Sequence, residues 1–182
     1  MKGIVFTSLL ELIEESFGLE TLDRIIEGSE LPSGGAYTAV GTYDAAEILA
    51  LVTTASRELN QPISEIVRWF GEQLFARLAS FQPALIEHAT DPLTVLESID
   101  AVIHQEVRRL YPDAELPTFE TSRPDDDTIV MRYRSSRPFA DLAEGLIRGC
   151  FAHYETPLDL QRTGDEGGCS ATFTARRIGT TT

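Results

Sequence analysis

A change in hydrophobic pattern near Pro112 constrains the fold more than any other feature of this sequence. Before Pro112, apolar residues recur at the three- to four-residue spacing of amphipathic helices. After it, short stretches rich in β-branched and aromatic residues alternate with turn residues, which is typical of strands. The predicted helices are residues 2–17, about 20–27, 44–58, 62–78, a brief piece between Pro83 and Pro92, 93–111 and 138–153. The predicted strands are residues 116–121, 128–134, about 156–162 and 169–177. Helices followed by a small antiparallel sheet that one helix crosses predict an α+β fold.

Composition narrows the class of protein. The 182 residues carry 15 basic and 29 acidic side chains, a net charge of -14, which argues against nucleic acid or an anionic membrane as partner. No apolar run approaches the roughly 20 residues that cross a bilayer, and the N-terminus lacks a signal-peptide pattern. Two cysteines make no disulfide framework. We therefore expect a soluble, cytoplasmic domain that does not bind membranes.

A spaced polar triplet and one histidine suggest the chemistry. In an extended strand Tyr133, Ser135 and Arg137 point the same way, and together they offer two hydroxyls and a guanidinium to a pair of carboxylates. His104 lies on the shoulder of the apolar stripe of helix 93–111, where it can face an interior cavity. One imidazole and a carboxylate clamp are what a haem needs, for its iron and its two propionates.

Simpler interpretations remain open from these residues alone. His104 can be a half-exposed helical residue, and the triplet can be a solvated strand face ending in an arginine. His88, between two proline-bounded turns, is expected at the surface. Cys150 and His153 form a Cys-x-x-His pair, but with Cys169 as the only further obvious donor the tetrahedral set for zinc is incomplete.

Segments along the whole chain add a family resemblance. They are Met1-Lys2-Gly3-Ile4-Val5, His104-Gln105-Glu106-Val107, Leu110 to Pro117, the Tyr133-x-Ser135-x-Arg137 triplet and Gly145-Leu146-Ile147-x-Gly149. Over roughly residues 1–178 the chain resembles the H-NOX (haem–nitric oxide/oxygen binding) family, which is related to the haem sensor domain of soluble guanylate cyclase. The resemblance implies one sensor domain, with a helical part (about 1–111) and a mixed part (about 112–178) that hold haem b between them, followed by a frayed tail, 179–182.

The resemblance also assigns roles to residues. His104 would be the axial iron ligand, Tyr133, Ser135 and Arg137 would hold the propionates, and Pro117 would press the porphyrin out of plane. The remaining pocket residues are apolar: Val5, Leu9, Leu74, Leu78, Leu142 and Leu146. Leu142 stands where oxygen-binding members have a tyrosine hydroxyl, and Leu74 replaces a second polar group. Bound dioxygen needs such a donor and nitric oxide does not, so we expect a nitric oxide sensor that excludes oxygen.

The expected role is regulatory. No nucleophile–base pair, phosphate loop or carboxylate dyad stands out, so an enzyme is not expected. Family behaviour implies that nitric oxide releases His104 and relaxes the haem. Carbon monoxide is a second candidate ligand. The signal would pass to a separate effector such as a histidine kinase or a cyclic-di-GMP enzyme. The alternatives are an oxygen-binding haem sensor or carrier, and a haem-free interaction or small-ligand-binding module.

Overall fold

The computed structural model describes residues 1–87, 89–164 and 167–179. The chain divides into two compact units, Met1–Phe70 and Gly71–Thr182. His88, most of the tail 179–182 and part of the turn 164–168 lie outside the described residues, and the organisation into one domain over 1–178 stays a prediction.

The first unit is helical. It contains α1 (Gly3–Phe17), α2 (Leu19–Glu27), α3 (Ala45–Leu59) and the start of α4 (Ile63–Phe81), with α2 packed against both α1 and α3. Gly18 ends α1 with φ 85°, a conformation that glycine adopts without strain. Asp44 caps the start of α3, because its carboxylate accepts the N–H of Ala46 at 2.9 Å. Both boundaries agree with the helices expected from the sequence.

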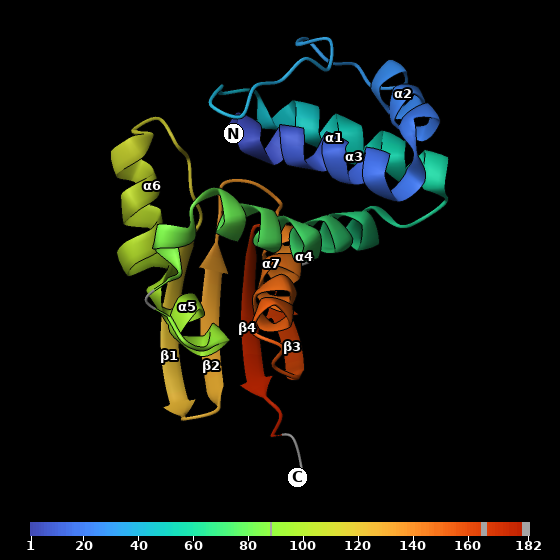
Figure 1. The fold of residues 1–182 in the computed structure, drawn as a ribbon. Helices are drawn as coiled ribbons and strands as arrows, with labels where there is room; N and C mark the ends of the chain where they lie inside the picture. Colours follow the sequence, from blue (N-terminus) through green and yellow to red (C-terminus); the bar gives the residue numbers. More distant parts are fainter. Residues whose placement is uncertain (88, 165–166, 180–182) are drawn as a thin grey trace. The chain divides into compact units, whose positions relative to one another are not determined.

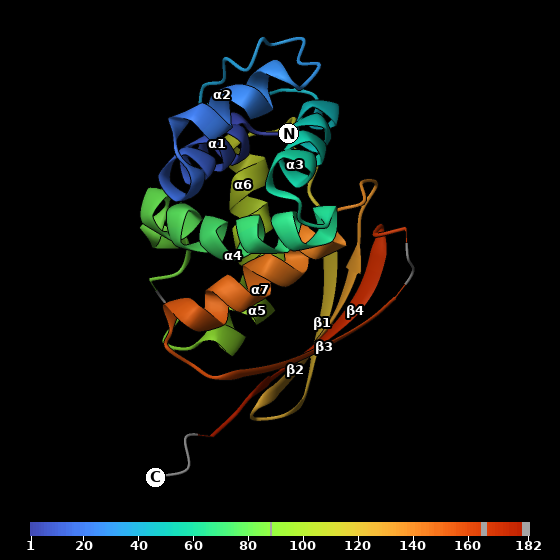
Figure 2. The same cartoon turned by 90° about the vertical axis from the view of Figure 1, so that its right-hand side faces the viewer.

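The second unit combines helices with a sheet (Figures 1 and 2). Its elements after α4 are η1 (Pro83–Leu85), α5 (Pro92–Ser98), η2 (Ile99–Ile103), α6 (His104–Leu110), β1 (Thr118–Asp125), β2 (Thr128–Arg134), α7 (Ala140–His153), β3 (Leu158–Gly164) and β4 (Ser170–Arg177). The four strands are antiparallel in the order β1-β2-β4-β3. Figure 2 shows α5 and α7 on one face of this sheet. The α+β architecture is confirmed.

Apolar side chains from α5, α7, β2 and β4 make the core of the second unit. Fully buried members include Leu93, Tyr133, Ile147 and Phe173. Their burial supplies the hydrophobic stabilisation that holds α7 on the sheet. None of the helices in the described part of the chain combines the length and hydropathy needed to cross a membrane.

Several boundaries differ from the sequence expectations by two or more residues, and three of the differences have a clear structural reason. The helix expected over 93–111 is interrupted, because η2 is a π-helical turn in which the N–H of His104 bonds to the carbonyl of Ile99. Helix α7 begins at Ala140, two residues after the expected start, with Phe139 as its N-cap. Strand β1 extends to Asp125 instead of ending at Thr121, because its pairing with β2 continues toward the turn.

Candidate functional site

His104 is the first residue of α6 and follows the π turn directly. Its side chain is 13% exposed, and its Nδ1 lies 2.6 Å from a carboxylate oxygen of Asp100. Burial lowers the pKa of His104 although Asp100 opposes this effect. The neutral imidazole is therefore favoured, and because Nδ1 is engaged by Asp100, Nε2 is the ring nitrogen that a metal would use.

Phe119 lies next to both His104 and Tyr133, a residue of the predicted clamp. Its ring centroid is 6.0 Å from that of His104 and 5.4 Å from that of Tyr133, which is also its direct partner across β1 and β2. The backbone N–H of Phe119 donates to the second oxygen of Asp100 at 2.8 Å. The fold thus places one phenylalanine next to both the predicted iron ligand and the tyrosine of the predicted clamp.

The clamp motif spans the end of a strand and the loop that follows. Strand β2 ends at Arg134, yet alternation of burial continues, with Tyr133 buried, Ser135 and Arg137 half-buried, and Ser136 exposed. Burial raises the pKa of the Tyr133 phenol above its ordinary value, so its hydroxyl is a hydrogen-bond donor well into the alkaline range. The loop is tied to the start of β4, because the N–H of Ser135 donates to the carbonyl of Cys169 at 2.9 Å. The hydroxyl of Ser135 in turn accepts the N–H of Arg137 at 3.1 Å.

The Arg137 guanidinium already binds a carboxylate. Its Nη2 donates to Glu115 in the segment before β1, and the Arg137 side chain is 22% exposed. A guanidinium in this partly buried position makes stronger hydrogen bonds to carboxylates than a fully solvated one. The Glu115 carboxylate shows that an acid group can reach the clamp.

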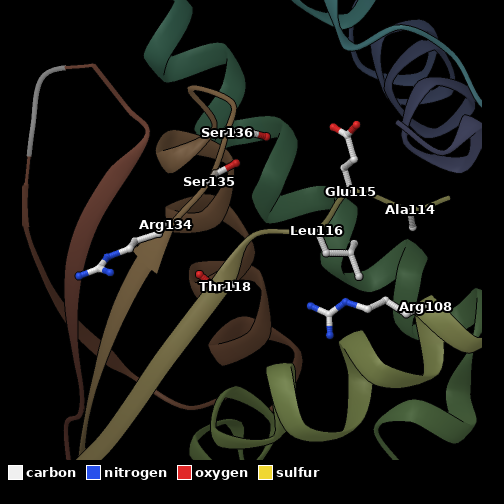
Figure 3. A pocket seen from close by; sticks show the side chains of 8 residues that line it. All are labelled: Arg108, Ala114, Glu115, Leu116, Thr118, Arg134, Ser135 and Ser136. Carbon is white, nitrogen blue, oxygen red and sulfur yellow. The ribbon is translucent and has the colours of Figure 1, made fainter. Parts of the chain in front are cut away.

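A cleft of about 510 Å³ opens beside the clamp (Figure 3). Figure 3 shows Arg108 extending from α6 toward the segment that carries Leu116, with Ser135 and Ser136 at the end of β2. The lining residues are Arg108, Ala114, Glu115, Leu116, Thr118, Arg134, Ser135 and Ser136. Its size lies within the roughly 300–1,000 Å³ of ligand pockets, and its polar lining combines two arginines, three hydroxyls and the Glu115 carboxylate.

The six apolar pocket candidates lie on three helices. Leu74, which is buried, and Leu78 belong to α4, and Leu142 and Leu146 belong to α7. Both pairs lie in the second unit, whereas Val5 and Leu9 lie on α1 of the first. Pro117, the remaining candidate, lies directly before β1, and its carbonyl favours protonation of His104.

Comparison with known proteins assigns the chain to a family. The profile of the haem-NO-binding (HNOB) family matches residues 2–162. The chain belongs to this haem-NO-binding family. An unliganded Fe(II) H-NOX protein from K. algicida is similar, with 36% identity, a TM-score of 0.93, and 100% of this chain and 99% of that chain covered.

Two further H-NOX structures were determined with gases. One from Shewanella woodyi, in the Fe(II)CO state with IWP-051 bound, has 42% identity and a TM-score of 0.84 over 100% of this chain and 97% of that one. One from S. oneidensis, in the Fe(II)NO state, has 26% identity and a TM-score of 0.91, with 98% of this chain and 100% of that chain covered. Members of the haem-NO-binding family are haem-based gas sensors.

The side chains of the second unit fit the haem that the family binds. A largely buried imidazole whose pKa is lowered is the form that ligates iron. A guanidinium that holds the Glu115 carboxylate, next to the Ser135 hydroxyl, can hold a propionate by the same chemistry. The donor set thus matches one metal ligand and acid groups.

Three residues of the site were missed by sequence reasoning. Asp100 precedes His104 by four positions, a spacing that indicates contact on a helix and that was available as a signal. Glu115 and Phe119 meet Arg137 and Tyr133 only through the tertiary fold, so no local pattern marks them.

Cys150 and His153, the Cys-x-x-His pair, have separate environments in this member of the haem-NO-binding family. Cys150 is buried in the core beside the carbonyl of Pro92, and burial raises the pKa of its thiol. His153 packs against the rings of Phe75 and Tyr154. In the described part of the chain, no group of three or more His, Cys, Asp or Glu side chains is arranged to hold a metal ion.

Proposed function

We propose that this chain binds haem b through His104 and acts as a nitric oxide sensor that excludes oxygen. The observation that carries the proposal is the imidazole of His104, which is nearly buried, is bound at Nδ1 to Asp100 and lies next to Phe119, the neighbour of the predicted clamp tyrosine. Tyr133, Ser135 and Arg137 would hold the propionates, with Arg137 exchanging Glu115 for an acid group of the cofactor. Haem iron, when bound, supplies the position at which the gas binds.

The choice of gas follows from the apolar side chains of α4 and α7. Leu74 is 2% exposed and Leu142 is half-buried, and neither can donate a hydrogen bond. A pocket walled by such residues leaves bound dioxygen without the donor that stabilises its partial negative charge. Nitric oxide needs no donor, so the leucines favour it over oxygen. Carbon monoxide, which is also uncharged, is a second ligand of this pocket.

Signalling would use the connections of His104 within the second unit. Its backbone belongs to the junction of η2 and α6, and its ring is tied through Asp100 to the start of β1. Freeing the imidazole from iron would let this junction adopt a second arrangement, which gas binding then populates. A separate effector, such as a histidine kinase or a cyclic-di-GMP enzyme, would recognise that arrangement. The net charge of -14 suits a basic docking face on the effector.

A visible absorption spectrum of the ferrous protein under nitrogen, air and nitric oxide tests the proposal. We expect a haem spectrum that changes with nitric oxide and is the same in air as in nitrogen, before slow oxidation. His104→Gly should change the spectrum unless imidazole is added, and His153→Gly serves as the matched control. A stable oxygen complex in air would instead establish the oxygen-binding alternative. A protein that stays colourless after hemin is supplied would establish the haem-free alternative.

A further inference from the structure

Asp100 contacts the proposed iron ligand and the sheet at the same time. One oxygen of its carboxylate lies 2.6 Å from Nδ1 of His104, and the other accepts the N–H of Phe119 at 2.8 Å. The two contacts join the π turn η2, which carries Asp100, to Phe119, the second residue of β1. The Asp100 side chain is 31% exposed, so both hydrogen bonds form in a partly desolvated position.

The chemistry of the carboxylate determines which ring nitrogen carries the proton. An ionised carboxylate only accepts hydrogen bonds, so Nδ1 of His104 must donate, and the lone pair of a neutral ring then belongs to Nε2. A carboxylate behind a ligating imidazole also fixes the orientation of the ring and makes the ligating nitrogen a stronger donor. Arg108 is the neighbouring cation that affects His104, and Asp100 is the carboxylate in contact with it.

We propose that Asp100 is the positioning residue for the iron ligand, and that it sets how tightly iron holds the His104 imidazole. The inference rests on the proposed haem-binding function. Phe119 contributes by holding the second oxygen of Asp100, so that the carboxylate cannot turn away from the ring. Through this contact, the strength of the iron–imidazole link is coupled to the position of β1.

Substituting the ligand from solution separates positioning from general stability. In His104→Gly protein loaded with haem, added imidazole replaces the side chain and can donate its N–H to Asp100. 1-Methylimidazole binds iron through the same type of nitrogen but carries a methyl group where the donor would be. The affinities of both ligands are read from the visible absorption spectrum, in His104→Gly and in the double variant that adds Asp100→Asn.

The ratio of the two affinities is the decisive quantity. Asp100→Asn keeps the shape of the side chain but removes the charge and one acceptor, so imidazole should bind about 10–100-fold more weakly. The affinity for 1-methylimidazole should change much less. A purely structural role for Asp100 would weaken both ligands equally and leave the ratio unchanged, which would overturn the inference. Glu106→Gln, which removes a carboxylate bound to Arg109 on the same helix, should leave the ratio as it is.

A second measurement keeps the inference testable if His104→Gly does not retain haem. The iron–histidine stretching frequency of the ferrous protein, recorded by resonance Raman spectroscopy, should fall in Asp100→Asn and remain unchanged in Glu106→Gln. Equal frequencies in wild type and Asp100→Asn would overturn the inference while leaving haem binding through His104 intact. A wild-type protein with no haem, or with no iron–histidine band, would instead refute the proposed function itself.

Discussion

Replacing Gly71 by alanine tests how closely α4 and α7 must approach. A Cβ atom at position 71 would lie 2.5 Å from the carbonyl oxygen of Leu142, and 3.0 Å from both Cα of Gly145 and the N of Leu146. All three neighbours are backbone atoms of α7, so no side-chain rotation can relieve the contact. The two helices would have to separate by roughly 0.5–0.9 Å to restore an ordinary contact distance.

The cost of this separation outweighs the gain in helix propensity. Overpacking of a tight core costs about 1–3 kcal/mol, whereas glycine to alanine in a helix gains roughly 0.8–1.0 kcal/mol. Because the neighbours are backbone atoms that cannot rotate away, the cost lies in the upper part of this range, about 2–3 kcal/mol. We therefore expect a net loss of about 1–2 kcal/mol in the free energy of unfolding. For a chain of 182 residues this corresponds to a Tm lower by roughly 2–8 °C.

Circular dichroism at 222 nm during heating measures the change. Gly149→Ala should behave in the same way, because its Cβ would lie 2.3 Å from the carbonyl oxygen of Glu72. Gly179→Ala is the matched control, since a Cβ there would meet nothing within 4 Å. If Gly71→Ala melted at or above the wild-type temperature, the inferred approach of α4 and α7 would be refuted.

Three other substitutions test the clamp, the gas pocket and a helix cap. Arg137→Ala should lose haem to a scavenging apoprotein about 10–100-fold more readily, because hydrogen bonds to charged groups contribute about 1.5–3 kcal/mol; Arg132→Ala, on the exposed side of β2, should not. Leu142→Tyr should gain an oxygen complex visible in the absorption spectrum, and Leu142→Phe, which lacks the hydroxyl, should not; equal behaviour would contradict the role of the missing donor. Asp91→Ala should lower the free energy of urea unfolding at pH 7 by about 0.5–2 kcal/mol, because Asp91 caps α5. Burial alone would raise the pKa of Asp91, but its hydrogen bonds outweigh burial and lower this pKa. The stabilisation by Asp91 is therefore complete above the unfolded pKa of about 3.9 and disappears as the pH falls through the folded pKa. A difference in stability between Asp91→Ala and wild type that persisted in acid would contradict this.

The elements of the fold could be predicted because their signals are local. Gly18 and Asp44 mark helix ends through the conformation of one residue or a contact two residues away. The strands follow from the alternation of apolar and polar residues, which the burial of β4 reproduces. The π turn before His104 could not be predicted, because one extra residue in a helical turn changes the hydrogen bonds without a characteristic sequence.

The candidate site could be predicted only where a single position carries its chemistry. Residue type, spacing and family resemblance predict His104 as a metal ligand and Arg137 as an anion binder, and both roles stay predictions. The contacts of this site could not be predicted in the same way, because Glu115 is 22 residues from Arg137 and Phe119 is 19 residues from Asp100. These contacts exist only after β1 has paired with β2 and α6 has been placed beside them. It follows that a change in the pairing of β1 would alter the contacts of the His104 imidazole with Asp100 and Phe119 without changing the histidine itself. Such a link between distant parts of the fold is the coupling that a sensor requires.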